Sequence, residues 1–102
     1  MAYDVGLEER IDDIIAGWAV DVAKRKMFGG LGCFMHRNMA FGVKADQLIV
    51  KADAEMLERL LQEQGMGYFE FGGKYMKTWL LAEGEVLDED NLPRLLEISR
   101  DF

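Results

Sequence analysis

One stretch, RKMFGGLGCF at residues 25–34, holds most of the residue types that could do chemistry. It contains two cations, three glycines and the only cysteine of the 102-residue chain. A phosphate-binding P-loop needs G-x-x-x-x-G-K-[ST], and nothing in the chain matches it. A dinucleotide loop needs G-x-G-x-x-G; Gly30 and Gly32 begin that spacing, but Met35 stands at its last glycine. The sequence therefore argues against both nucleotide loops.

A looser anion site is a second interpretation of the same stretch. Lys24, Arg25 and Lys26 form the only tight basic cluster of the chain. Backbone N–H groups in a glycine-rich bend can bind an anion, and these three cations would stand beside it. The residues leave this possible anion site open.

The cysteine and the histidine do not predict a catalytic or metal site. A nucleophilic thiolate needs a neighbouring base or cation. His36 follows Cys33 by three residues, which places the two on opposite faces of a strand. We expect Cys33 to be a small buried residue and His36 to border a hairpin turn in contact with solvent. A structural zinc site needs four ligands; the sequence predicts no catalytic residues, no metal and no cofactor.

The third interpretation of the glycines is structural. Gly29, Gly30 and Gly32 at the entrance of a strand allow a bulge or a close approach that a Cβ would block. Met27 and Phe28 would then anchor the bend in the core. We favour this interpretation.

Composition indicates one globular domain, residues 1–102. Half of the residues are hydrophobic, enough for one core. The net charge is −7, from 19 acidic and 12 basic residues, which argues against direct binding to nucleic acid. The sequence shows no signal peptide or membrane span, and its single cysteine fits a reducing compartment. We expect a cytoplasmic protein.

The periodicity predicts helices at the start, middle and end of the chain. Apolar residues at helical spacing predict a helix over 5–19. Asp53 is the expected N-cap of a second helix that ends at Gly65. The segment 88–100 predicts a terminal helix, with Asp90 as its cap.

Strand-like segments fill the intervals between these helices. Residues 31–36 and 39–44 flank Arg37-Asn38, which we expect to be a tight turn. A second turn at 44–47 leads into a third strand. Residues 66–82 predict another hairpin, with Gly72-Gly73 in its turn.

The fold class predicted from these elements is α+β, with helices packed on one five-stranded antiparallel sheet. The strands carry apolar residues on both faces, so helices on one face would leave a second apolar face. Such a face favours a protein partner or a homodimer. The candidate interface residues are Phe34, Phe41, Phe69 and Trp79.

The chain resembles the TfoX/Sxy N-terminal domain family. Members show an Arg-Met-Phe-Gly-Gly segment, a strand that reads like Leu-Tyr-Leu-Lys, and a later Gly-x-x-Met hairpin. Here Lys26 stands where Arg often precedes Met, and Ile49 replaces the usual aromatic. The residues that carry the resemblance are Arg25, Lys26, Met27, Phe28, Gly29, Gly30, Gly32, Gly73 and Met76.

The resemblance implies a two-layer fold of order α-β(3)-α-β(2)-α, related in topology to type III secretion chaperones. It also implies a link to the regulation of natural competence genes together with the cAMP receptor protein. Regulators of that kind carry a second, C-terminal domain, and we expect this chain to be the first domain alone. The function expected is a non-enzymatic regulatory or adaptor module that binds another protein; the alternative is a small-ligand or anion binder at Lys24-Arg25-Lys26.

Overall fold

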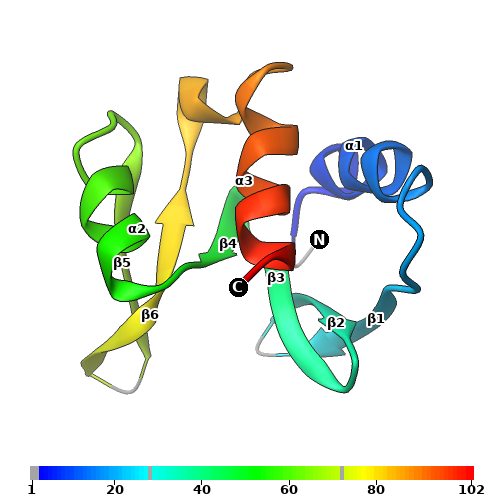
Figure 1. Ribbon diagram of the computed structural model, residues 1–102, viewed down its shortest axis with the longest axis horizontal. Coiled ribbons are helices and arrows are strands. Elements are labelled where there is room, and N and C mark those ends of the chain that lie inside the picture. The colour runs from blue at the N-terminus through cyan, green and yellow to red at the C-terminus, as the bar shows by residue number, and fades with distance from the viewer. Residues whose placement is uncertain (1–2, 28, 72) are drawn as a thin grey trace.

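The structure is a computed structural model that describes residues 3–27, 29–71 and 73–102, with backbone only for 71, 75 and 76. These residues form three α-helices, a 3₁₀ helix and six strands (Figure 1). The elements are α1 (Val5–Ile15), β1 (Ala23–Met27), β2 (Gly30–Met35), β3 (Asn38–Lys44), β4 (Gln47–Lys51), α2 (Ala54–Leu60), β5 (Met66–Phe71), β6 (Lys74–Ala82), η1 (Gly84–Leu87) and α3 (Asn91–Arg100).

All strands belong to one antiparallel sheet of order β1-β2-β3-β4-β6-β5. The predicted α+β class is confirmed, but the sheet has six strands rather than five. The additional strand is β1, which contains Lys24, Arg25 and Lys26. It lies at the edge of the sheet, where charged side chains are common because they discourage pairing with other chains. This strand was not predicted because its charged residues do not show the alternation of apolar and polar residues that indicates a strand.

The three helices pack on one face of the sheet. Their buried side chains, such as Ile11 of α1, Leu57 of α2 and Leu95 of α3, join one core cluster with strand residues. Figure 1 shows α3 between α1 and α2. The strand side chains that face the helices in this cluster include Leu31, Cys33, Phe41, Val43, Leu48, Val50, Leu80 and Ala82.

The β2–β3 turn is one residue earlier than predicted. Met35 pairs with Asn38, so the two-residue turn is His36-Arg37 rather than Arg37-Asn38. His36 has φ 52° and Arg37 φ 71°, the positive values that tight hairpin turns require. Asn38 was predicted to lie in the turn because asparagine tolerates positive φ, but it is the first residue of β3. His36 is exposed at the turn, as expected.

The first two helices are confirmed, and both end earlier than predicted. In α1 the Asp4 carboxylate accepts a hydrogen bond from the Leu7 N–H, and the helix ends at Ile15 rather than at residue 19. Trp18 therefore lies beyond the helix, where its ring meets that of Phe41 edge-on at 5.9 Å. Asp53 caps α2 through the Met56 N–H at 2.8 Å.

Gly65 lies five residues beyond Leu60, the last residue of α2, and turns the chain into β5. Its φ is 90°, and a Cβ there would overlap the carbonyl oxygen of Glu83. The sequence predicted that the helix would end at Gly65. In the structure the helix ends at Leu60, and Gly65 makes a separate turn later in the same connection.

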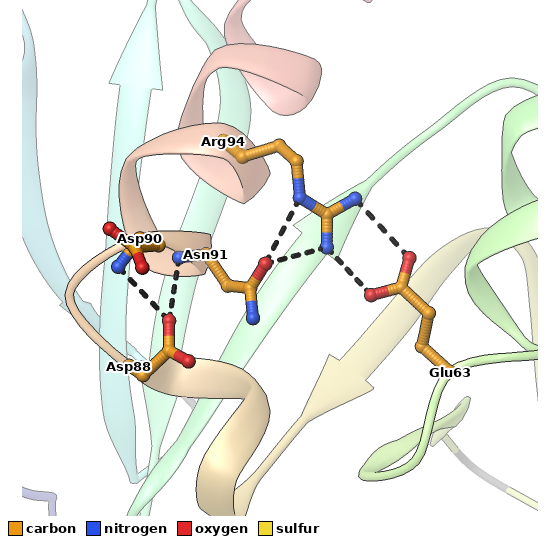
Figure 2. A network of polar contacts seen from close by, with 5 residues as sticks. All are labelled: Glu63, Asp88, Asp90, Asn91 and Arg94. Carbon is orange, nitrogen blue, oxygen red and sulfur yellow. Dashed lines mark hydrogen bonds and ion pairs between the residues drawn. The ribbon is translucent and has the colours of Figure 1, made fainter.

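Asp90 is the N-cap residue of α3, as predicted, but the carboxylate that caps the helix is that of Asp88. The Asp88 carboxylate accepts hydrogen bonds from the N–H groups of Asp90 and Asn91, at 3.0 and 2.8 Å, whereas the Asp90 side chain makes no cap hydrogen bond (Figure 2). Arg94 of α3 then donates two hydrogen bonds to Glu63, at 2.6 and 3.2 Å. This network ties the start of α3 to the turn after α2.

The two aspartates give a matched test. We predict that Asp88→Ala lowers the free energy of unfolding by about 1 kcal/mol because two N–H groups lose their acceptor. Asp90→Ala should change it by less than about 0.5 kcal/mol. Urea denaturation followed by circular dichroism measures both; a larger loss in Asp90→Ala would contradict this assignment of the cap.

Candidate functional site: the open face of the sheet

Strand alternation sends a second set of side chains away from the helices. We call this surface the open face. Two of its residues, Ile49 and Phe69, are buried yet lie outside the core cluster that includes the helices. The apolar members of the open face, assigned by strand register, are Met27, Phe34, Met39, Ile49, Phe69, Trp79 and Leu81. The cations among them are Arg25, Lys44 and Lys51.

A pair of glycines gives the larger side chains of the open face room to lie flat over the strands. Gly32 of β2 pairs directly with Gly42 of β3. A Cβ on Gly32 would lie 2.8 Å from the Met27 sulfur and 3.0 Å from the Phe34 ring. A Cβ on Gly42 would lie 2.9 Å from the Met39 methyl group. The missing side chains thus make a trough that larger neighbouring side chains fill, although none of the described helices lies over it.

Gly42 also sits where the β2 backbone approaches closely, since a Cβ there would overlap the Leu31 carbonyl oxygen. We predict that Gly42→Ala lowers the free energy of unfolding by about 2–3 kcal/mol through overpacking. Gly67→Ala is the matched control on the same face, because its Cβ would meet nothing within 4 Å. Equal free energies of unfolding for the two variants in urea denaturation would contradict the close packing of neighbouring atoms around Gly42.

The cations of the open face lie over aromatic rings. Arg25 stands 5.6 Å from the centre of the Phe34 ring, and Lys51 stands 5.3 Å from that of Trp79. Lys44 stands 5.6 Å from the centre of the Phe69 ring. None of these three cations forms an ion pair with a described carboxylate. Cation–π contact therefore holds each charge at the surface without neutralising it.

The predicted anion cluster does not assemble. Lys24 and Lys26 point to the helix side of β1, whereas Arg25 points to the open face. The Lys24 ammonium contacts Glu8 at 2.6 Å and Asp12 at 3.0 Å. These carboxylates raise the pKa of Lys24, mainly through the Glu8 hydrogen bond. Strand alternation thus puts the three cations on two faces of the sheet, and one of them, Lys24, forms ion pairs with α1.

This ion pair predicts a pH dependence. The Lys24 hydrogen bond holds the pKa of Glu8 below its ordinary value of 4.5, so its stabilising contribution is present above pH 4.5 and is lost as acid protonates Glu8. At pH 7, Lys24→Met should lower the free energy of unfolding by about 1 kcal/mol or less because the pair is partly exposed. Below pH 4.5 this loss should shrink.

Lys26→Met is the control for this test, since Lys26 lies on the same side of β1 but makes no ion pair with a described residue. Its effect should be small at both pH values. A loss in Lys24→Met that stays constant down to pH 2.5 would contradict the role of Glu8.

Three of the four candidate interface residues reach the open face: Phe34, Phe69 and Trp79. Phe41 does not, and its prediction as a contact residue was wrong. Cys33 pairs with Phe41 but Phe34 pairs with Met39, so β3 carries an extra residue at this point. Phe41 therefore turns toward the helices, where it is 0% exposed.

A cleft of about 470 Å³ lies at the β1–β2 end of the open face. Phe34 forms part of its wall, and Arg25, His36 and Arg37 surround it together with Asp21. Sequence reasoning placed His36 and Arg37 at a turn but gave them no role. A prediction with the turn at residues 36–37 would have placed His36 and Arg37 at the end of β2, near Arg25 of the neighbouring strand.

The remaining candidate groups do not form a reactive site. Burial raises the pKa of the Cys33 thiol to about 12, and Cys33 is 0% exposed, as the sequence predicted for a small buried residue. No three described His, Cys, Asp or Glu side chains come together as a metal site. None of the helices among the described residues is long and apolar enough to cross a membrane.

A second hollow, about 500 Å³, lies between α2 and α3. Met56 and Ile98 contribute apolar surface, and Asp53, Glu97 and Asp101 make its rim acidic. The Arg94 guanidinium also borders it but is bound by Glu63 (Figure 2). The helix side thus presents acidic surface, opposite in sign to the open face.

The comparison with protein families settles the identity of the domain. The model of the TfoX N-terminal domain matches residues 13–101. The chain belongs to this family. No curated protein and no solved structure matches it, so the likeness to secretion chaperones stays a prediction.

The residues that carry the family resemblance surround the open face of this TfoX N-terminal domain. Met27 lies on that face and covers Gly32. Gly29 has φ 73° in the β1–β2 connection, and Gly73 has φ 82° in the β5–β6 turn. Phe28, the predicted turn residue Gly72 and the Met76 side chain lie outside the described residues. The glycine stretch turns β1 into β2 and shapes the surface above both strands. The prediction that Met27 anchors this bend in the core was wrong, because strand alternation puts Met27 on the open face, outside the core cluster.

Proposed function

We propose that this TfoX N-terminal domain is a non-enzymatic regulatory or adaptor module that binds another protein through its open face. The observation that carries the proposal is the open face itself: an apolar surface with aromatic residues that no described helix covers. Phe34, Met39 and Trp79 on this face are each only partly buried. Aromatic residues and methionine are enriched at protein interfaces.

The membership in the family supports a regulatory role, and we place that role in the control of transcription or competence. The buried Cys33 supports a non-enzymatic mode of action, since its thiol stays protonated and inaccessible. We favour this function over the alternative anion site, because Lys24 is engaged by α1 and the cluster is divided between two faces.

Affinity capture with matched variants tests the proposal. A tagged domain should retain the same protein partner in repeated captures, and Phe34→Ala should lower recovery of that partner by about tenfold, as expected for an aromatic interface residue. Met56→Ala, in the hollow between α2 and α3, should leave recovery unchanged. Circular dichroism checks that both variants fold.

Two results would contradict the proposal in different ways. No reproducible partner for the wild-type domain would contradict binding to a protein. Loss of the partner in Met56→Ala but not in Phe34→Ala would move the interface from the open face to the helix side.

A further inference from the structure

Charge is divided between the strands and the rest of the chain. Seven of the eight charged residues in the six strands are basic, although the chain as a whole has a net charge of −7. The strand cations are Lys24, Arg25, Lys26, Lys44, Lys51, Lys74 and Lys77, and the strand anion is Glu70. The remaining 18 carboxylates lie in the helices, turns and loops. The strands are therefore basic although the net charge of the whole chain is negative.

The two sides also differ in how their cations are used. On the helix side, Lys24, Arg59 and Arg94 each form an ion pair with a carboxylate. On the open face, Arg25 and Lys44 lie over rings, without a described carboxylate within ion-pair distance. The charges of the open face are therefore available to a partner.

From this arrangement we propose that the open face binds an acidic, apolar segment of a partner protein. Apolar side chains of the segment would pack on Met39 and Trp79, and its carboxylates would pair with Arg25, Lys44 and Lys51. The cleft beside Phe34 would receive an anchoring side chain, and the cations Arg25 and Arg37, which outnumber the carboxylate of Asp21 around it, favour an acidic neighbour. The inference rests on the proposed function and names the chemistry of the partner.

Charge separates this occupant from two others. A second copy that paired face to face would bring Arg25, Lys44 and Lys51 against the same cations, which costs free energy. Nucleic acid carries a phosphate at every nucleotide, so a domain of net charge −7 opposes it more strongly than a segment with a few carboxylates among apolar residues. Phe69, only 7% exposed, also offers little ring surface for a base to stack on.

Selection from a displayed library of random 16-residue peptides tests the inference without a known partner. Peptides enriched on the wild-type domain should carry net negative charge together with aromatic or aliphatic residues. Their affinity should fall about tenfold or more in the triple variant Arg25→Glu/Lys44→Glu/Lys51→Glu and should weaken with added salt. Arg59→Glu is the matched control, because its ion pair on α2 is largely exposed; it should bind normally.

A milder variant, Lys44→Gln/Lys51→Gln, keeps the test valid if the triple variant unfolds; it should still weaken binding severalfold. Enriched peptides of neutral or positive charge, or no enrichment, would overturn the inference. So would tighter binding of a 20-nucleotide oligo-dT than of the enriched peptides. A dimer in light scattering that Lys44→Gln/Lys51→Gln alters would likewise overturn it, in favour of a second copy.

The two proposals fail separately. Affinity capture that returns a reproducible partner lost in Phe34→Ala, combined with peptides that are not acidic, would leave the adaptor function standing and remove only the acidic chemistry. Capture that returns no partner would remove the adaptor function itself.

Discussion

The pairing of Gly32 with Gly42 is the constraint on which both faces of the sheet depend. On one side, Cys33 and Phe41, the neighbours of these glycines in sequence, project into the core under the helices. On the other side, the absence of two Cβ atoms lets Met27 and Met39 lie over the strands. A side chain at either position would push these residues outward. The glycines thus allow the face of the sheet that carries no described helix to be partly buried by its own side chains.

Strand alternation gives each face its charge. Lys24 and Arg25 are adjacent in sequence, yet one pairs with Glu8 on α1 and the other stacks on Phe34. A paired cation contributes a modest amount to stability, whereas a cation over a ring keeps its charge available. The acidic helices and the basic sheet are therefore two surfaces with different chemistry, on a chain whose average charge is acidic.

Several parts of the fold could be predicted because their signals are local. Asp53 as a helix cap and the glycine turn between β5 and β6 depend on residues within a few positions of one another. The edge strand β1 could not be predicted, because solvent exposure on both faces removes the apolar alternation that identifies a strand. Asp90 was correctly predicted as the N-cap residue, but both aspartates can cap, and only the path of the backbone makes the Asp88 carboxylate the acceptor.

The site was harder to predict than the fold, because it depends on which face each strand residue takes. One extra residue in β3, at Ala40, changes the face of every residue on one side of it. Phe41 was misplaced for this reason, and Arg25 and Arg37 could not be joined to Phe34. Their position around one cleft depends on pairings across β1, β2 and the turn at 36–37.

The most direct test of the account is hydroxyl-radical footprinting of the domain, purified and inside the cell, read out by mass spectrometry. If the open face binds a protein, Met27, Met39 and Trp79 should be labelled severalfold less in the cell than in the purified domain. Met56, between α2 and α3, should be labelled equally in both. Equal labelling of the open-face residues, or protection of Met56 alone, would contradict the account.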